Sequence, residues 1–315
     1  MTAAPALEER RAEPRRRRIL VSLRHATTIL AVVIPPAGIL SAIGVFWGVG
    51  VGVVDVVLLF SGYVLTVSGV TVGLHRYFSH RSFKTSKPVE AALAILGSMA
   101  VQGTVTGWVA EHRKHHALSD KEGDPHSPWT PRGKGPLGKL GGLWHAHIGW
   151  FFTTKALDPR ERFARDWIDD PLVRTLDLLY PVWIVLTLGI PFGIGYAFGG
   201  VGGGVEALVW GGLIRVFVVH HLTWSVNSIG HMYGKQAYRS RDESRNTPFL
   251  VLPSLGDAYH NNHHAFPSSA IHGFDPGQVD LSGLVIRGLE RLGLVWDVKR
   301  PDPQQLERRR IAAAG

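Results

Sequence analysis

Nine histidines stand in three short clusters and at one separate position, and their spacing is typical of metal ligands. The clusters are His75-Arg-Tyr-Phe-Ser-His80, His112-Arg-Lys-His115-His116 and His260-Asn-Asn-His263-His264. The separate residue is His231, four positions after Asn227. Imidazole is the commonest protein metal ligand, and residues spaced i, i+3 and i+4 share one face of a helix. One metal ion cannot use nine imidazoles, so the pattern predicts a site for two.

Simpler explanations of these histidines must be weighed against a metal site. A single histidine is more often a satisfied core or surface residue than a ligand, and histidine-rich tracts can bind stray metal without function. Here the clusters lie far apart in the chain, and the last two repeat the pattern H-x-x-H-H. A solvated surface would not produce that repetition, so we favour the metal site.

The chemistry of such a site follows from its ligands. Neutral, all-nitrogen coordination suits Zn, Cu, Fe or Ni. The Glu-x-x-His motif of soluble di-iron bundles is absent from the sequence, and a zinc hydrolase needs only three ligands and an open position. Two redox metals beside a membrane would suit O2 activation against a hydrophobic substrate. Attack on an alkyl C–H bond requires a metal-based oxidant, and hence electrons and oxygen.

The elements that must position the histidines include long apolar segments. Between Ala26 and Leu74 the only charged residue is Asp55, and between Leu178 and Ile214 it is Glu206. The first stretch is long enough for two spans of about 20 residues, and the second allows another pair. We therefore predict four transmembrane helices in two hairpins. They are expected at about residues 27–48, 53–73, 175–197 and 204–226.

A large polar portion must lie outside the bilayer, because the mean hydropathy is only +0.07. We predict an all-α integral membrane protein whose helical cap holds the histidine-ligated dimetal site. The cap is expected over residues 74–174 and 227–300, within one domain of residues 25–300. Residues 1–24 are predicted to be a mobile basic tail, and residues 301–315 a C-terminal tail.

The distribution of Lys and Arg predicts the orientation. Arg15 to Arg18 precede the first expected span, whereas the loops around residues 46–52 and 197–204 contain no Lys or Arg. By the positive-inside rule, both termini and all three histidine clusters face the cytoplasm. The net charge of +9 then reflects topology and anionic lipid headgroups, with no nucleic-acid signal. The chain has no cysteine, which excludes a cysteine-ligated iron–sulfur cluster within it.

The first cluster raises a geometric question. His75 and His80 are five residues apart, which is about 140° around an α-helix. They cannot share one face of a regular helix. We therefore expect the helix to end or turn between them, so that the two rings approach the site from different directions.

These motifs closely resemble those of the membrane-bound fatty acid desaturases, specifically the stearoyl-CoA Δ9 type. The first cluster matches the H-x4-H box of that family, and the other two match its H-x-x-H-H boxes. Asn227-Ser-Ile-Gly-His231 is similar to its N-S-x-x-H element. Smaller similarities are Asp124-Pro125-His126, His147-Ile148-Gly149-Trp150 and Gly256-Asp257-Ala258-Tyr259. The resemblance covers roughly residues 60–275.

The resemblance implies a di-iron centre (Fe2+/Fe3+) with O2 as co-substrate. The implied ligands are His75, His80, His112, His115, His116, His231, His260, His263 and His264. It further implies that Asn227 holds a water on one iron, and that the acyl tunnel is lined by Gln102, Trp108, Thr223 and Trp224. The two tryptophans could instead be interfacial belt residues, and Gln102 a surface amide.

Metal-bound histidines usually need an acceptor for their other ring N–H. Glu111, Asp120 and Asp257 are candidates for this role.

We therefore predict an oxidoreductase that inserts a cis double bond at C9 of a saturated acyl-CoA or acyl-lipid. No H-P-G-G haem-binding segment stands at either end, so we expect no fused cytochrome b5, as in bacterial members of the family. Electrons would come from a separate donor, such as a ferredoxin with its NAD(P)H reductase. One alternative is a histidine-box hydroxylase acting on an alkane, sterol or carotenoid. Another is a non-catalytic metal-binding or lipid-binding membrane protein.

Overall fold

The computed structural model describes residues 32–33, 36–40, 43, 51–130, 138–153 and 160–311. The predicted tail 1–24 lies outside these residues, and so does most of the predicted first span, 27–48. The described chain is predominantly helical. Its one sheet pairs two short antiparallel strands, β1 (Lys84–Thr85) and β2 (Val295–Trp296).

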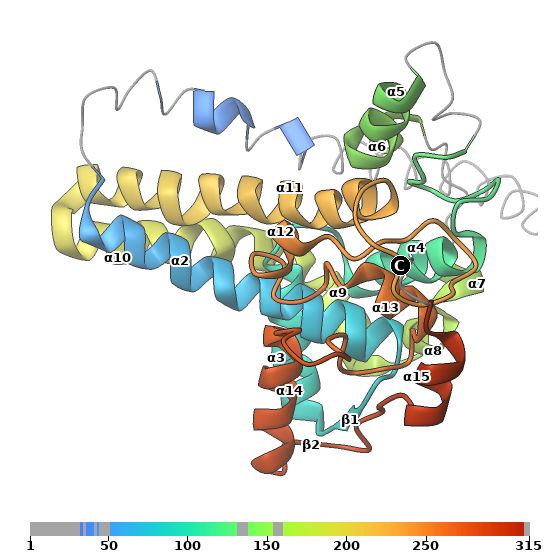
Figure 1. Ribbon diagram of the computed structural model, residues 1–315. Coiled ribbons are helices and arrows are strands. Elements are labelled where there is room, and N and C mark those ends of the chain that lie inside the picture. The colour runs from blue at the N-terminus through green and yellow to red at the C-terminus, as the bar shows by residue number, and fades with distance from the viewer. Residues whose placement is uncertain are drawn as a thin grey trace, which may run out of the picture.

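Two long apolar helices form one part of the molecule (Figure 1). The first is α2 (Val53–Ser68), which continues into the π-helical segment η1 (Gly69–Ser79). The second runs through α10 (Tyr180–Ala207), η3 (Leu208–Ile214), α11 (Arg215–Ser228) and η4 (Ile229–His231). Both are long and apolar enough to cross a membrane, which indicates membrane association.

The second long helix reverses direction at a glycine pair. Gly199 and Gly200 have non-helical backbone angles, and Gly200 has a φ of 60° and a ψ of −150°. That region is essentially restricted to glycine. After the reversal Gly195 and Gly203 lie so close that a Cβ on Gly195 would collide with the Gly203 backbone. The apolar sequence from Tyr180 onward therefore forms two packed arms.

The boundary expected near residue 175 differs in the structure. Pro171–Leu178 forms a separate helix, α9, and the apolar helix begins only at Tyr180. Asp170 caps α9, because its carboxylate accepts hydrogen bonds from the N–H groups of Leu172 and Val173.

The shorter helices gather at one end of the long ones (Figure 1), and we call them the helical lobe. They are α3 (Lys87–Ser98), α4 (Val105–Leu118), α5 (Gly138–Trp144), η2 (His145–Gly149), α6 (Trp150–Thr153), α7 (Arg160–Phe163), α8 (Arg165–Ile168), α9, α12 (Pro248–Val251), α13 (His260–Ala265), α14 (Leu281–Arg291) and α15 (Pro303–Arg309). Helix α15 lies in the predicted C-terminal tail. It is followed by Ile311, whose N–H donates to the Ala237 carbonyl.

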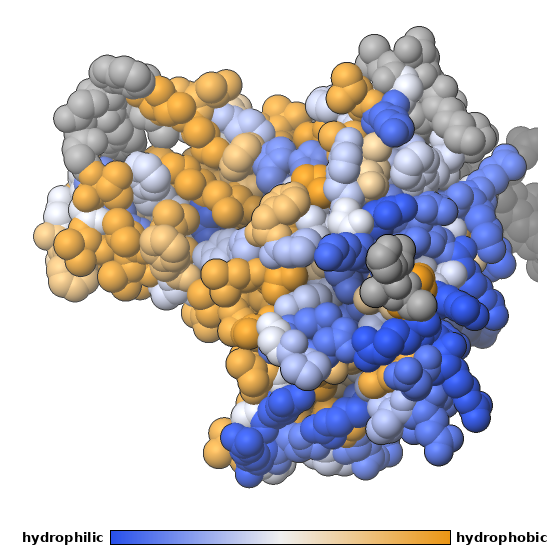
Figure 2. All heavy atoms as spheres, viewed as in Figure 1, coloured by the Kyte–Doolittle hydropathy of each residue, from blue (hydrophilic) through white to orange (hydrophobic). Residues whose placement is uncertain are grey.

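The core joins the lobe to the first long helix. Leu74 and Phe78 of η1 are fully buried, as are Val109 of α4 and Ile286 of α14. A Cβ on Gly69 would collide with the backbone of α3 at Leu96, so η1 lies directly against α3. This close packing holds the segment that carries the first histidine cluster. Figure 2 shows apolar residues over the long helices and mostly hydrophilic ones over the lobe.

One buried cation ties the long helices together. Arg215 of α11 is 2% exposed and donates to the hydroxyls of Thr66 on α2 and Thr187 on α10. It also donates to the carbonyl of Gly211. Because its described partners are neutral oxygens on several helices, the guanidinium links those helices through hydrogen bonds.

Candidate dimetal centre

The first histidine cluster lies at the end of the π-helical segment η1, with His75 inside the segment and His80 directly after its last residue, Ser79. The N–H of His80 donates to the His75 carbonyl over 3.2 Å, an i→i+5 bond. In this wider helix residue i+5 lies nearly above residue i, so both rings point to the same side, with centroids 5.1 Å apart. The helix ends at Ser79, between the two histidines, as expected, but the expectation that the rings approach from different directions is wrong. It assumed α-helical spacing, and the π-helix removes the 140° offset.

The two H-x-x-H-H clusters lie on α-helices that face η1. Helix α4 carries His112, His115 and His116, and α13 carries the third cluster. Thr104 caps α4 by accepting a hydrogen bond from the Gly107 N–H. His231 comes from η4, at the end of the second long helix.

All nine predicted ligands lie in two adjacent groups. The first group is His75, His80, His112, His116 and His263, and the second is His115, His231, His260 and His264. Within each group the candidate ligand nitrogens lie within 4.8 Å of one another. Each H-x-x-H-H helix contributes to both groups. On α4, His112 and His116 face the first group and His115 faces the second.

Ring nitrogens in these groups face each other at the spacing of metal ligands. His75 Nδ1 lies 2.8 Å from Asp257, so it carries the proton and its Nε2 presents a lone pair. That Nε2 is 2.9 Å from His263 Nε2, which is itself 2.9 Å from His116 Nε2. One ring proton cannot serve both neighbours of His263. Two metal–nitrogen bonds of about 2.05 Å at a right angle place their nitrogens about 2.9 Å apart, so the spacing fits a shared cation.

The second group presents unpaired lone pairs. His115 Nδ1 is 3.0 Å from Asp124, and His264 Nδ1 is 2.7 Å from Asp242. The Nε2 atoms of both histidines are buried and have no hydrogen-bond partner. Buried polar atoms without partners are uncommon and costly. A cation bound by the group would satisfy both nitrogens, so the residues present fit a metal ion.

Four carboxylates orient the rings, and sequence reasoning found two of them. The predicted contacts of Asp257 and Asp120 with ring N–H groups are confirmed, because Asp257 lies 2.8 Å from His75 Nδ1 and Asp120 lies 2.8 Å from His231 Nδ1. Asp124 and Asp242 were missed in this role. Asp124 belongs to the Asp-Pro-His similarity and could have been suspected. Asp242 lies on a surface loop without a local signal. The role suggested for Glu111 stays a prediction.

A buried ion network keeps Asp257 in its charged form. Arg76, fully buried, donates to Asp257 Oδ1 over 2.9 Å and to both oxygens of Asp280 over 3.0 Å. Burial alone would raise the pKa of Asp257, but its contacts with His75 and Arg76 outweigh burial and hold that pKa well below its usual value. Asp257 therefore remains a carboxylate that can accept the His75 proton.

Burial also keeps the ring nitrogens available as ligands. It lowers the pKa of His80, His112 and His116 well below the usual value, and neighbouring imidazoles lower these pKa values further. Neutral imidazole is the form that binds metals. These rings are consequently ready to coordinate at neutral pH.

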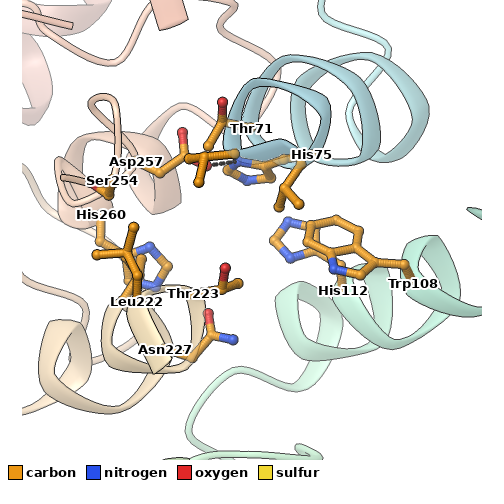
Figure 3. Close-up of a pocket in the computed structure, with 13 residues that line it drawn as sticks. Thr71, His75, Trp108, His112, Leu222, Thr223, Asn227, Ser254, Asp257 and His260 are labelled. Atoms are coloured by element: carbon orange, nitrogen blue, oxygen red, sulfur yellow. Dashed lines mark hydrogen bonds and ion pairs between the residues drawn. The ribbon is translucent and has the colours of Figure 1, made fainter. Parts of the chain in front are cut away.

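Both histidine groups border one pocket (Figure 3). His75 and His112 of the first group and His260 of the second line it. Its other lining residues are Val67, Val70, Thr71, Trp108, Leu222, Thr223, Val226, Asn227, Ser254 and Asp257. Figure 3 shows Asn227 and Thr223 pointing into the space between the two groups. The pocket therefore combines an apolar wall with a histidine-rich one.

Three of the four predicted tunnel residues form a chain at this pocket. Trp108 donates from its indole nitrogen to Gln102 Oε1 over 3.1 Å, and Gln102 Nε2 donates to the Thr223 hydroxyl over 2.9 Å. Trp224 lies elsewhere, with its ring 5.2 Å from that of Phe151 and 5.9 Å from that of His147. The geometry thus connects Gln102, Trp108 and Thr223 but does not bring Trp224 to them.

Two further histidines adjoin the groups, and their contacts were not foreseen. The ring of His272 is 4.7 Å from that of His263, and its Nδ1 is 3.1 Å from the Arg76 guanidinium. His126 lies 4.4 Å from His115, measured between ring centroids, and could share a metal with it and Asp124. His272 lacks a neighbouring ligand motif, so its position could come only from the fold.

The chain is similar in sequence to known proteins. A family model described as fatty acid desaturase matches residues 53–275. The hex-5-enoyl-[acyl-carrier protein] acetylenase of Moorena producens is 44% identical over 283 residues, which cover 89% of this chain and 88% of that protein. Delta-9 acyl-lipid desaturase 1 of Arabidopsis thaliana is 38% identical over 257 residues, 79% of this chain and 76% of the relative. The sn-1 stearoyl-lipid 9-desaturase of Anabaena variabilis is 37% identical over 238 residues, 75% of this chain and 80% of that one.

Proposed function

The chain belongs to the fatty acid desaturase family, and from that premise we propose that it inserts a cis double bond at C9 of a saturated acyl-CoA or acyl-lipid. Membership makes it an oxidoreductase of lipid metabolism. The observation that carries the finer proposal is the shared pocket, where two histidine groups border an apolar space. An alkyl chain in that space would have its methylene groups beside both groups.

The proposed cofactor is a pair of iron ions that uses O2 as co-substrate. The five-histidine group would hold one iron and the four-histidine group the other, with Asn227 beside them to hold a water. If bound, the irons would supply the activation of O2. O2 would take two hydrogens from adjacent carbons, two electrons from the external donor and two protons, and would leave as two molecules of water. A ferredoxin with its NAD(P)H reductase is the proposed source of electrons.

The chain's own residues would orient the substrate. Val67, Val70 and Val226 provide the apolar wall on which an acyl chain can pack. Gln102 joins Trp108 to Thr223, so the indole and the hydroxyl hold fixed positions beside the histidines. Because a displacement of one methylene moves the attacked bond, this fixed wall would set the position of the double bond.

The proposed topology has four transmembrane helices and a cytoplasmic cap formed by the helical lobe. The reversal at Gly199 and Gly200 supports two spans within the second long helix, and the first long helix would be one of a second pair. The absence of Lys and Arg around residues 46–52 and 197–204 supports an orientation with both termini and the histidine groups in the cytoplasm.

A second candidate function follows from the similarity to the acetylenase. That relative is 44% identical over 89% of this chain, and its name describes an acyl-carrier-protein substrate and an acetylenic product. The same histidine groups could serve a chain tethered to a carrier protein, or a second desaturation of an existing double bond.

One expression experiment separates these functions. We would express the chain with a ferredoxin and its reductase, beside His263→Ala, and locate double bonds in the acyl chains by derivatisation and mass spectrometry. As a control, His221→Ala removes an imidazole that lies outside both groups. Loss of two mass units at C9–C10, absent from His263→Ala and present in the control, is expected.

Other products would change the conclusion. A loss of four mass units, or activity only on carrier-protein substrates, would favour the acetylenase-like function. A gain of sixteen mass units would establish a hydroxylase instead. If no product forms although purified protein contains two irons and receives electrons, the desaturase proposal is refuted for the acyl donors supplied.

A further inference from the structure

Helix α14 presents an apolar face to the outside of the described structure. Leu284 is 52% exposed, Val285 42% and Leu292 73%. On the opposite side Ser282 and Ile286 are fully buried against the core. A helix that packs on a core needs only one apolar side, so the second apolar side calls for a different explanation.

The exposed residues form a continuous strip with a basic border. At 100° per residue, Leu284, Val285 and Leu292 fall within a sector of about 100°. Arg287 and Arg291 lie along one edge of that sector, and both are exposed. An apolar face bordered by arginines is the pattern of helices that lie in the membrane interface.

The orientation of α14 suits that position. Figure 1 shows α14 running across the direction of α2, α10 and α11, at the end where these long helices meet the lobe. In Figure 2 apolar residues continue from the long helices down the adjacent edge of the lobe. Beyond the helix, Leu294 is 40% exposed and Trp296 is 45% exposed. Tryptophan is enriched at membrane–water interfaces.

We propose that α14 lies in the headgroup region of the bilayer, parallel to its surface, with the strip Leu284, Val285 and Leu292 in contact with lipid. The charge along the helix fits this partner. Glu290 forms an ion pair with Arg300, with 2.5 Å between Oε2 and Nη2. Arg287 and Arg291 are thus available to bind anionic headgroups. Because apolar residues run from the long helices along the adjacent edge of the lobe in Figure 2, one bilayer can cover both.

This contact would set the depth of the histidine groups relative to the lipid. Asp280 precedes α14, caps it by accepting from the Gly283 N–H at 2.9 Å, and binds Arg76 through both oxygens. Arg76 in turn holds Asp257, which orients His75. A helix seated on the bilayer is therefore joined to the first histidine group by two carboxylates and one guanidinium. This consequence rests on the proposed function, whereas the membrane contact itself does not.

Spin labelling tests the contact directly, because the chain has no cysteine of its own. Leu284→Cys and Leu292→Cys would each carry a nitroxide on the strip. Gln305→Cys is the matched control, since it is exposed on α15, which Figure 1 places on the side of the lobe away from the long helices. The labelled full-length proteins would be reconstituted into vesicles of three parts phosphatidylcholine to one part phosphatidylglycerol.

The measurement is the accessibility of each nitroxide to O2, which concentrates in lipid, and to a water-soluble nickel complex. We expect the ratio of O2 to nickel accessibility to be several-fold higher at positions 284 and 292 than at position 305. Equal nickel accessibility at all three positions would overturn the proposal, because the strip would then face water. Protection from both reagents together with spin–spin broadening would also overturn it, because a second copy of the chain would then cover the strip.

The fold of each labelled protein is checked by its circular dichroism and metal content, so the test needs no catalytic activity. A protein that desaturates nothing can still show lipid contact at α14. A protein that desaturates acyl chains can equally show α14 in water. The membrane contact of α14 and the desaturase function can therefore each be refuted without refuting the other.

Discussion

Replacing Asp242 with Asn should weaken metal binding in the four-histidine group. Asp242 accepts from His264 Nδ1 through one oxygen at 2.7 Å, and from the Ser244 N–H and hydroxyl through the other at 3.1 and 2.6 Å. Asparagine has one acceptor oxygen and one NH2 group, so it cannot accept on both sides. If the oxygen stays with Ser244, the NH2 faces His264 and moves the ring proton to Nε2. A protonated Nε2 cannot bind a metal.

The size of the effect follows from the hydrogen bond that is lost. Burial would raise the pKa of Asp242, but His264 outweighs it and holds that pKa well below its usual value, so the acceptor is a carboxylate. Hydrogen bonds to charged groups contribute about 1.5–3 kcal/mol, which is about 10- to 150-fold in a binding constant. Loss of an outer partner of a metal ligand typically weakens metal binding about 10- to 100-fold. We therefore expect a loss of one to two decades in affinity for one ion.

Chelator competition on purified protein measures this loss, with bound metal determined by mass spectrometry. At a chelator concentration that leaves two ions on the unchanged protein, Asp242→Asn should retain one. Asp166→Asn is the control, because it makes the same chemical change at a carboxylate held by Arg81 and Arg113, and should retain two. Identical competition curves for all three proteins would refute the reasoning, and so would loss of both ions from Asp242→Asn in one step.

Three further changes have defined outcomes. Arg76→Met should lower the free energy of unfolding, measured with denaturant, by about 3–5 kcal/mol, because two buried carboxylates lose their cation. The control Lys84→Met removes an exposed cation and should change this free energy little. Equal effects of the two substitutions would contradict the prediction. Thr223→Val removes the hydroxyl that accepts from Gln102 and should reduce turnover up to about tenfold. It should also yield double bonds at more than one position, so an unchanged ratio of positional isomers would count against the prediction. The metal-free protein should lose stability as pH falls below 6.5, because burial lowers the pKa of His272 from 6.5 to about 4 and only the unfolded chain binds the proton. His272 alone contributes about 3 kcal/mol to that loss below pH 4, and a flat profile of melting temperature against pH would disprove the prediction.

The candidate ligand set could be recognised from sequence because its signals are local. Three positions spaced i, i+3 and i+4 share a helix face whatever the rest of the fold does, so α4 and α13 were expected to present their rings together. Apolar stretches interrupted only by Asp55 or Glu206 identify long membrane-type helices for the same reason. The described structure has two such helices.

The partition of the nine rings between two groups could not be predicted in this way. It depends on how η1, α4 and α13 pack, which sends His115 to one group and its neighbour His116 to the other. The hydrogen bond from the His80 N–H to the His75 carbonyl, which spans five residues, likewise could not be predicted from the spacing of the two histidines. No residue pattern distinguished a π-helix from an α-helix there. The spacing rule for an α-helix therefore gave the wrong relative direction for the rings of His75 and His80.

The sequence by itself determined the donor atoms and the helical faces that carry them, because both depend on residue type and on short spacings. Tertiary structure decided which carboxylate orients which ring. Asp242 and Asp124 reach His264 and His115 only because the chain folds back at the site. Tertiary structure also separated Trp224 from Thr223, since consecutive residues on a helix point about 100° apart and only packing settles which of them faces the pocket.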